Sequence, residues 1–415
     1  MYLYRVLQDY LTDRFLVYDT QEGAKKKRIT SGAAQGSVLG ADLWNINYDG
    51  ILRIEMPEGV FLVGYADDIV AVIRARTLEL LQLKLNQTMR RVIRWMESRS
   101  LSLATQKTEI VLLTRKRIDR VIPMRVDEHT IMTSNAIRYL GVMLDGKLSF
   151  WTHIRTVADK AAGVVGKLSR LMANIGGPSP AKRRLLIRTT EAIMLYGAEV
   201  WAEALRFHSY RDKLGAVQRR GALRICSAYR TVSGPAVQVV AGAIPIDLLA
   251  EERRRIYLRK EEEAPRRVKK EERETTMEKW QNRWNTESRG RWTARLIRVL
   301  KDWTERKHGE TNYYLTQFLT GHGYFRSFLV KIGKSQSRQC VYCGAEEEDA
   351  YHAFFECSHW EHQRQNLVRD VGDFEPETII VKMISKKETW DAVNGYVISV
   401  LKVKERDREW EGDGR

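Results

Sequence analysis

Two adjacent aspartates, Asp67 and Asp68, lie between two short apolar runs in the stretch FLVGYADDIVAVI, residues 61–73. The runs predict a hairpin of two strands buried on both faces, with the acids at its bend. Two carboxylates this close repel each other, so each is driven towards protonation unless a cation lies between them. Mg²⁺ is the natural cation, because it binds carboxylate oxygens together with substrate phosphates. The pair therefore indicates either a two-metal site for phosphoryl transfer or an exposed acidic turn.

Three of the four cysteines gather with a histidine in the last quarter of the sequence. The set is Cys340, Cys343, His352 and Cys357. Its spacing, C-x2-C-x8-H-x4-C, can supply four tetrahedral ligands to a structural Zn²⁺. His359 and His362 are possible substitutes for the histidine, and the alternative for the whole set is a small core of unliganded cysteines. The fourth cysteine, Cys226, is predicted to be a core residue.

The formal net charge is +17, and the usual partner of such an excess is a polyanion, although a solvated basic surface is the alternative. Basic residues recur on successive predicted helices after residue 150 and together indicate a groove that follows a nucleic-acid backbone, with steep salt dependence. They are Lys160, Lys167, Arg170, Lys182, Arg183, Arg184, Arg188, Arg219, Arg220 and Arg224. No uncharged apolar run is long enough to cross a bilayer, and charged first residues exclude a secretory signal. We therefore expect a soluble, intracellular protein without a membrane partner.

The elements that must position these groups change in kind near residue 150. Before that point the sequence predicts helices, hairpin strands and a Gly-rich loop that leads into a helix within 31–52. After it, helices dominate, with a solvated charge-dense helix and linker at 251–274 and no strong pattern beyond about 370. The expected helices are 1–14, 77–98, 151–175, 181–207 and 209–228, and the expected strands lie within 14–30, 61–73, 103–116 and 137–145.

In their order and spacing, four short motifs resemble those of reverse transcriptases from non-LTR retrotransposons. YADD at 65–68 is similar to the central motif of that family, and QGSVLG at 35–40 to the motif before it. KTEIVLLT from Lys107 resembles the following motif, and YLGVMLD from Tyr139 resembles the primer grip. Later phrases such as YGAEVW and the Cys/His cluster extend the likeness over nearly the whole chain. In particular, the chain resembles Pol polyproteins of the arthropod type-1 elements that insert into ribosomal DNA.

The resemblance implies catalytic roles for three residues. Asp67 would be the principal Mg²⁺ ligand, and Asp68 its acidic neighbour with a less direct role. Lys107 would either protonate the departing pyrophosphate or steer its charge, and the alternative is a lysine that contacts phosphate or solvent.

The resemblance also implies positions for the substrates. Tyr65 would abut the primer end, and Gln35 and Gly36 would lie in the loop that contacts the template and the incoming nucleotide. Leu140 and Gly141 would form the primer grip, where backbone shape matters more than side-chain chemistry.

Two departures and one absence mark this sequence against the family. The family usually has Pro before the Gln and after the LG of its Gly-rich loop, where this chain has Ala34 and Ala41. The remaining metal-binding Asp of the family lies upstream, in a strand–helix motif that Asp9, Asp13 and Asp19 do not fit. We therefore expect a fragment that begins partway through the palm and does not polymerise alone, with an upstream endonuclease also missing.

The resemblance implies an α+β fold: part of a right-hand polymerase palm with an antiparallel sheet, then an all-α thumb and connector, then a small zinc knuckle. The expected domains are fingers and palm at 1–150, thumb at 151–235, connector at 236–330, zinc knuckle at 331–370 and a tail at 371–415. The implied function is an RNA-directed DNA polymerase that copies element RNA, in the nucleus, from a nicked target DNA primer. It would use dNTPs, two Mg²⁺ ions and a structural Zn²⁺. The alternatives are an inactive nucleic-acid-binding remnant and, third, a structural adaptor with coincidental motifs.

Overall fold

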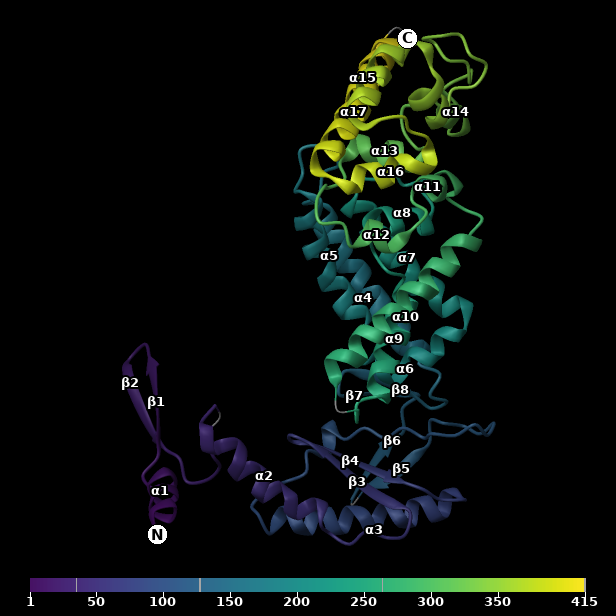
Figure 1. Cartoon of the computed structure of the whole chain (residues 1–415). Coiled ribbons are helices and arrows are strands. Elements are labelled where there is room, and N and C mark those ends of the chain that lie inside the picture. Colours follow the sequence, from purple (N-terminus) through teal and green to yellow (C-terminus); the bar gives the residue numbers. More distant parts are fainter. Residues whose placement is uncertain (35, 127, 263, 414–415) are drawn as a thin grey trace. The chain divides into compact units, whose positions relative to one another are not determined.

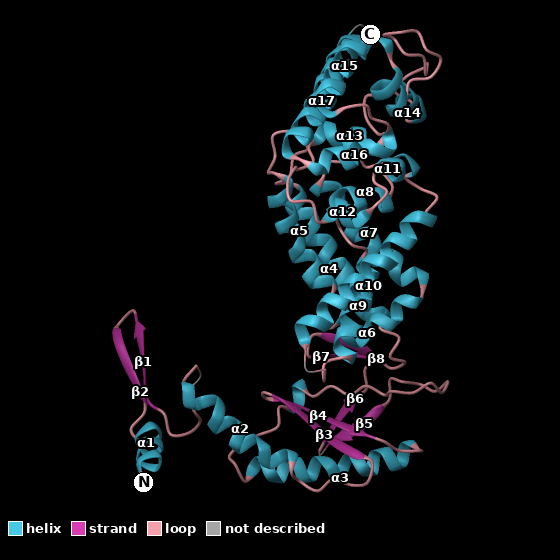
Figure 2. Ribbon diagram, in the orientation of Figure 1, coloured by secondary structure: helices cyan, strands magenta, loops and turns pink. Residues whose placement is uncertain are grey.

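The computed structural model describes residues 1–34, 36–126, 128–262 and 264–413, and it divides into two compact units (Figure 1). Unit 1 comprises Met1–Leu112 and Lys116–Asn135, and unit 2 comprises Leu113–Arg115 and Ala136–Arg415. Helices and small two-stranded antiparallel sheets make up the described chain (Figure 2), which confirms the α+β composition expected from the sequence.

Unit 1 contains three two-stranded sheets and three α-helices among its described residues. Each hairpin pairs neighbouring strands, β1 with β2, β3 with β4 and β5 with β6. The elements are α1 (Tyr2–Leu11), β1 (Phe15–Thr20), β2 (Gly23–Arg28), α2 (Val38–Leu52), β3 (Val60–Tyr65), β4 (Asp68–Ile73), α3 (Leu78–Glu97), the short turn η1 (Thr105–Lys107), β5 (Pro123–Val126) and β6 (His129–Met132).

Helix α3 organises the small core of unit 1. It begins at Thr77, whose hydroxyl accepts a hydrogen bond from the amide of Leu80, 3.2 Å away. Apolar residues at helical spacing, including Leu85 and Met89, pack against Met124 of β5. This confirms the helix that the sequence predicts at 77–98 and gives the acidic hairpin a covered side.

The acidic hairpin is half-buried on one face and largely exposed on the other, so the prediction of burial on both faces is wrong. Antiparallel pairing places Phe61, Val63 and Tyr65 on the other face, where their side chains are exposed by 55%, 48% and 65%. Helices α2 and α3 cover the same face of this two-stranded sheet, because α2 contacts β3 at Gly64 and α3 packs around Ile73. Strand β3 thus carries apolar side chains on its exposed face as well as on its covered face.

Two further strand predictions also need correction. Residues 103–116 form the turn η1 and then an extended segment joined to Ser134 by one isolated bridge from Val111, not a paired strand. Residues 137–145 do not form one strand but a hairpin, because Leu140 and Gly141 both have positive φ, 44° and 84°. Positive φ at two successive residues is typical of the tight turn that joins hairpin strands.

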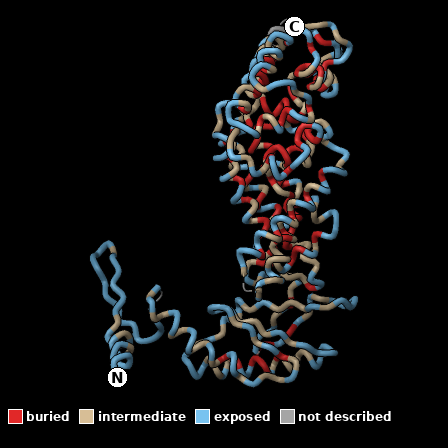
Figure 3. The backbone as a smooth tube through the Cα atoms, in the orientation of Figure 1, coloured by how far each residue is buried: buried red, intermediate tan, exposed pale blue. Residues whose placement is uncertain are grey.

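Unit 2 is helical apart from this hairpin, as far as its described residues show. Figure 3 places most of the buried backbone here, along the helices. The elements are β7 (Ala136–Tyr139), β8 (Val142–Asp145), α4 (Trp151–Ser169), α5 (Pro180–Met194), α6 (Ala198–Trp201), η2 (Ala202–Arg206), α7 (His208–Ile225), α8 (Gly234–Ala241), α9 (Ile246–Leu258), α10 (Pro265–Thr286), α11 (Arg291–Leu296), α12 (Leu300–Thr304), α13 (Tyr313–Thr320), α14 (Arg326–Lys331), η3 (His352–Glu356), η4 (Ser358–Trp360), α15 (Glu361–Val371), α16 (Pro376–Ser385) and α17 (Lys387–Asp413).

The helices expected at 151–175, 181–207 and 209–228 are present, but the second one is broken. Helix α5 ends at Met194, and Gly197, with φ of 64°, precedes the short helix α6. The break lets a new helix direction start, since a residue with positive φ cannot continue a right-handed helix.

The charge-dense stretch is less solvated than its composition predicts. Helices α9 and α10 pack together, and the buried acids Glu252 and Glu272 form ion pairs with Arg273 at 2.8 Å and Arg255 at 2.5 Å. Buried acids need such partners, because an unpaired buried carboxylate is costly.

The last segment, in which the sequence shows no strong pattern, forms helices α16 and α17. Trp390, Val397 and Leu401 of α17 belong to the same buried cluster as Cys340 and Cys357. Among the described residues, no single helix is long and apolar enough to cross a membrane, and α8 with α9 reaches that measure only as a pair bent by 63°.

Candidate functional site

The acidic turn is a loop of two residues, Ala66 and Asp67, between Tyr65 and its partner Asp68. Ala66 has φ of 54°, a left-handed conformation that Gly adopts at less cost than Ala. Both carboxylates are exposed at the end of the hairpin. The strand alternation breaks at this point, so both acids lie at one end of the sheet, where they are exposed.

Helix α2 holds the turn by its backbone. The indole Nε1 of Trp44 donates to the carbonyl of Ala66 at 3.0 Å, and the hydroxyl of Tyr48 donates to the carbonyl of Asp68 at 2.8 Å. The two rings stack with their centroids 5.7 Å apart, as residues four apart on one helix face can do. The sequence prediction missed both residues, and their spacing in LWNINY was the signal that could have found them.

The Gly-rich loop is anchored at the start of α2. Ser37 caps the helix, since its hydroxyl accepts from the amide of Gly40 at 3.0 Å, and the hydroxyl of Tyr10 lies 2.5 Å from the same oxygen. A Cβ at position 40 would come within 2.7 Å of the Ala34 carbonyl oxygen. Gly36 has φ of 83°, and the predicted template-contacting residue Gln35 lies outside the described residues.

Lys107 lies at the end of η1 with an exposed side chain. Its backbone amide donates to the carbonyl of Ala104 at 2.9 Å. Its ammonium contacts neither Asp67 nor Asp68 in the part of the chain that the structure describes, so its role stays a prediction.

The predicted primer-grip residues lie in unit 2, at the tip of the β7–β8 hairpin. The hydroxyl of Tyr196 donates to the carbonyl of Leu140 at 2.9 Å, and a Cβ on Gly141 would lie 2.7 Å from the ring of Tyr196. Behind the hairpin, the amide of Met143 donates to Nδ1 of buried His153 at 3.2 Å. Burial lowers the pKa of His153, so the ring stays neutral and able to accept this bond.

The four cysteine and histidine residues of the predicted metal set converge. Their ligand atoms all lie within 4.8 Å of one another. The Sγ atoms of Cys340 and Cys357 are 3.9 Å apart, and Sγ of Cys343 lies 3.3 Å from Nε2 of His352. A tetrahedral Zn²⁺ with usual bond lengths needs separations of about 3.8 Å and about 3.6 Å. The residues therefore fit zinc.

The surroundings also suit a cation. Burial raises the pKa of the Cys357 thiol to about 12, so this group would ionise at neutral pH only beside a positive charge. A carboxylate oxygen of Glu356 lies 3.7 Å from Nδ1 of His352, the ring atom that faces away from the cysteines. This is the position from which carboxylates orient metal-binding histidines. The ring of His359 instead packs against Tyr342 and, edge-on, against Trp360, with centroids 4.9 Å and 4.5 Å apart.

The basic residues predicted to line a nucleic-acid groove are mostly accessible, with one clear exception. Arg183 is buried, and its guanidinium donates to the carbonyls of Pro178, Ala173 and Arg224. Its inclusion among the nucleic-acid contacts is wrong, because burial leaves no surface for a phosphate. Cys226 is fully buried, as predicted for a core residue.

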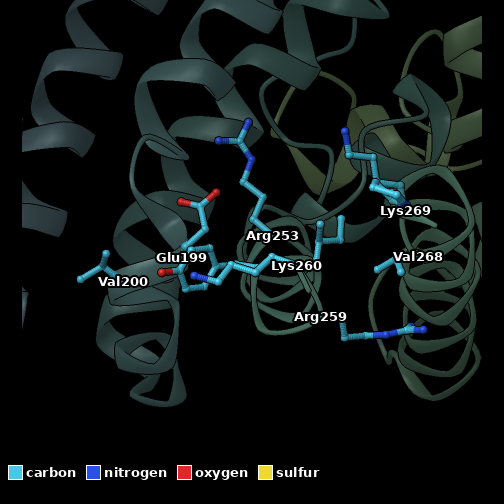
Figure 4. Close-up of a pocket in the computed structure, with 10 residues that line it drawn as sticks. Glu199, Val200, Arg253, Arg259, Lys260, Val268 and Lys269 are labelled. Atoms are coloured by element: carbon cyan, nitrogen blue, oxygen red, sulfur yellow. The ribbon is translucent and has the colours of Figure 1, made fainter. Parts of the chain in front are cut away.

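A pocket of about 620 Å³ opens between α6, α9 and α10 (Figure 4). Its lining combines apolar side chains such as Tyr257 and Val268 with Glu199 and several cations. Arg259 at its edge is already paired with Glu271 at 2.7 Å and Glu272 at 2.9 Å. The cations of the lining are suited to contact an anion.

Residues 3–144 match the family model of the reverse transcriptases, described as RNA-dependent DNA polymerases. Three of the four motifs fall within that range, and so does all of the fourth except its last residue, Asp145. No solved structure matches the chain.

Relatives with curated descriptions extend the similarity beyond residue 144. A retrovirus-related Pol polyprotein from type-1 retrotransposable element R1 2 of Nasonia vitripennis is 32% identical over 352 residues, which cover 80% of this chain and 86% of that protein. A putative 115 kDa protein in type-1 retrotransposable element R1DM of Drosophila melanogaster is 31% identical, over 84% of this chain and 36% of that protein. A similar polyprotein of Bradysia coprophila is 28% identical over 86% of this chain. The chain thus spans little more than a third of the two longer relatives, 36% and 37%.

Proposed function

The chain belongs to the reverse transcriptases of type-1 retrotransposable elements of the R1 kind, and from that membership we propose that its acidic turn is the metal-binding centre of an RNA-directed DNA polymerase. The reaction joins a nucleotide to a primer end opposite an RNA template. A remnant that binds nucleic acid without catalysis is not favoured by this membership.

The position of Asp67 and Asp68 carries the proposal. Both acids lie at the open end of a hairpin whose turn is bonded to the helix of the Gly-rich loop. Bound divalent ions would neutralise the two carboxylates and stabilise the charge on the phosphates of a nucleotide. The exposure of both acids suits this role, because substrate phosphates must reach the same place.

The other predicted site residues would have the roles that the family resemblance implies. Tyr65 adjoins the turn on β3 and would lie against the primer end, while Gln35 and Gly36 would contact the template and nucleotide. Leu140 and Gly141 would support the primer strand by their backbone. Lys107 would act on the departing pyrophosphate or contact phosphate.

The larger parts would follow the right-hand arrangement that the family resemblance implies. Unit 1 with the β7–β8 hairpin would be part of the fingers and palm, and helices α4 to α7 the thumb. Exposed cations on those helices, including Lys167, Lys182 and Arg220, would contact phosphates of the primer–template duplex. The primer would be nicked target DNA and the template the RNA of the element, in the nucleus, and the parent polyprotein would also carry an endonuclease.

The Cys/His cluster would hold one structural Zn²⁺. Three thiolates and one imidazole form a closed set, so no position is left for a reacting water. Cys340, Cys357 and His352 are buried, which suits a stabilising role.

Primer extension on an RNA template tests the polymerase proposal. Asp67→Asn should reduce the rate of nucleotide addition at least about a thousandfold, because a neutral amide cannot replace a carboxylate that holds a divalent ion. Asp42→Asn, an exposed acid on α2, is the matched control and should leave the rate unchanged. If the 415-residue chain has too little activity to measure, the same variants are compared in the translation product of the whole element. Undiminished extension by Asp67→Asn would refute the proposal.

A further inference from the structure

Helix α2 connects the Gly-rich loop to the acidic turn through two aromatic side chains. Trp44 and Tyr48 are half-buried, and their polar atoms donate to the carbonyls of Ala66 and Asp68, one on each side of Asp67. We propose that these two side chains are positioning residues, which fix the backbone around the metal-binding carboxylate and tie it to the Gly-rich loop. The inference rests on the proposed function.

The conformation of Ala66 gives the contact with Trp44 its importance. An L-residue with φ of 54° is strained, and such strain persists only where the surroundings over-determine the backbone. The indole bond to the Ala66 carbonyl, at 3.0 Å, supplies that constraint on the strained peptide itself. Without it, the turn could relax towards other loop conformations that aim Asp67 differently.

The contact of Tyr48 depends on a missing side chain on β3. A Cβ at Gly64 would lie 2.4 Å from Cε1 of Tyr48, closer than atoms approach. Gly at this position therefore lets the phenol ring lie against the strand and reach the carbonyl of Asp68. Any larger residue at position 64 must displace the ring and lose the bond.

The other end of α2 is fixed as well. Ser37 caps the helix and lies within hydrogen-bond distance of Tyr10, so the loop that would contact the nucleotide is attached to the same helix. From Ser37 to Tyr48 the helix rises about 16 Å, as a stiff rod of three turns. A shift of the Gly-rich loop would therefore move the acidic turn with it. The distance between the loop and the turn would stay constant, so that one nucleotide fits between them.

Hydrogen exchange of the whole chain tests, without any metal, whether the hydrogen bonds of Trp44 and Tyr48 hold the acidic turn. Trp44→Phe and Tyr48→Phe each keep an aromatic ring and remove one donor. Each should speed amide exchange of residues 65–69 about five- to tenfold. Ile46→Ala, on an exposed part of the same helix, should leave that exchange unchanged. Unchanged exchange in both aromatic variants would overturn the inference.

Mn²⁺ binding, followed by electron paramagnetic resonance with primer–template and dNTP present, tests the consequence for the carboxylates. The Mn²⁺ binding that is lost in Asp67→Asn is the binding at the acidic turn. The affinity of that site should fall about tenfold in Tyr48→Phe and in Gly64→Ala. Ala66→Gly should restore part of the affinity lost in Trp44→Phe, because Gly adopts positive φ without strain. If the aromatic variants loosen the turn yet keep full affinity, or if Ala66→Gly restores none, the positioning role is wrong.

These two measurements separate this inference from the proposal that it rests on. If the wild-type chain has no Mn²⁺ binding that depends on Asp67, the proposed metal centre is wrong. The positioning role of Trp44 and Tyr48 is then tested by amide exchange at residues 65–69 alone.

Discussion

Asp67 has a conformation that its neighbours impose. Its loop partner Ala66 is held with φ of 54°, at a cost of about 1 kcal/mol for a residue with a Cβ. Aromatic donors on α2 offset that cost by bonding the carbonyls on both sides. The position of the Asp67 carboxylate therefore depends on the backbone of the turn as well as on the side chain itself.

Neighbouring basic residues can have opposite roles, and Arg183 with Lys182 gives a direct test. Arg183 is 3% exposed and satisfies three backbone carbonyls, whereas Lys182 is exposed. Arg183→Met should lower the free energy of unfolding by about 2–4 kcal/mol, because it leaves buried acceptors unpaired. Chemical denaturation measures this.

Lys182→Met is the matched variant and should leave stability within about 0.5 kcal/mol. It should instead weaken binding to a primer–template duplex and reduce the salt slope by about one unit. Equal stability of Arg183→Met and the wild type would contradict the structural account of Arg183.

At this scale the sequence identified Asp67 and Asp68 as candidate metal ligands, a role that stays a prediction, but not the residues that support their turn. The two acids can be recognised in the sequence, because two adjacent charges between apolar runs need an explanation. Trp44 and Tyr48 look like ordinary helix residues, since their function depends on which backbone carbonyls the fold brings within 3.0 Å and 2.8 Å. Arg183 was misplaced for the same reason, because burial is a property of the packed helices and not of a run of basic letters.

Among the elements, the β7–β8 hairpin depends most on local backbone geometry. Its two-residue turn needs positive φ at Leu140 and Gly141, and Tyr196 closes over that turn. The sequence predicted one strand here because apolar residues lie on both sides of the LG pair. Leu seldom adopts positive φ, so this pair gave little sign of a turn.

Two Gly→Ala variants of unit 2 should have opposite effects. Gly141→Ala should lower the free energy of unfolding by about 1–3 kcal/mol, since φ is 84° and the new Cβ would meet the ring of Tyr196 at 2.7 Å. Gly163→Ala on α4 should raise it by about 0.5–1 kcal/mol, because a Cβ there meets nothing within 4 Å and Ala favours a helix. Thermal unfolding of both variants checks the pair, and a Gly141→Ala variant as stable as wild type would contradict the account of the turn.

On the scale of the whole molecule, the two units differ in how much core they contain. The cluster in unit 1 has four buried residues, Leu85, Met89, Met124 and Val126, whereas unit 2 has two large clusters. The metal set belongs to the larger of those two, together with residues of α17. The sequence could predict the set from its spacing. That the last helix packs in the same cluster was missed, although Trp390, Val393, Val397 and Val400 of α17 recur at helical spacing.

Metal removal should therefore loosen the end of unit 2. We expect about one zinc per chain, and Cys343→Ser should lower zinc content and speed hydrogen exchange in α15 and α17. Cys226→Ala, at the one cysteine outside the set, should keep full zinc content. Zinc analysis with exchange measurements checks this, and a Cys343→Ser chain with full zinc would exclude the assigned ligand set.

In the proposed active centre, the two carboxylates of the acidic turn hold divalent ions beside a nucleotide. Anomalous scattering from Mn²⁺ in crystals of the protein with primer–template and dNTP tests it most directly. We expect a strong peak within about 2.0–2.6 Å of an Asp67 carboxylate oxygen and of the nucleotide phosphates. A bound nucleotide with its metal elsewhere, and with Asp67 and Asp68 turned towards solvent, would contradict it.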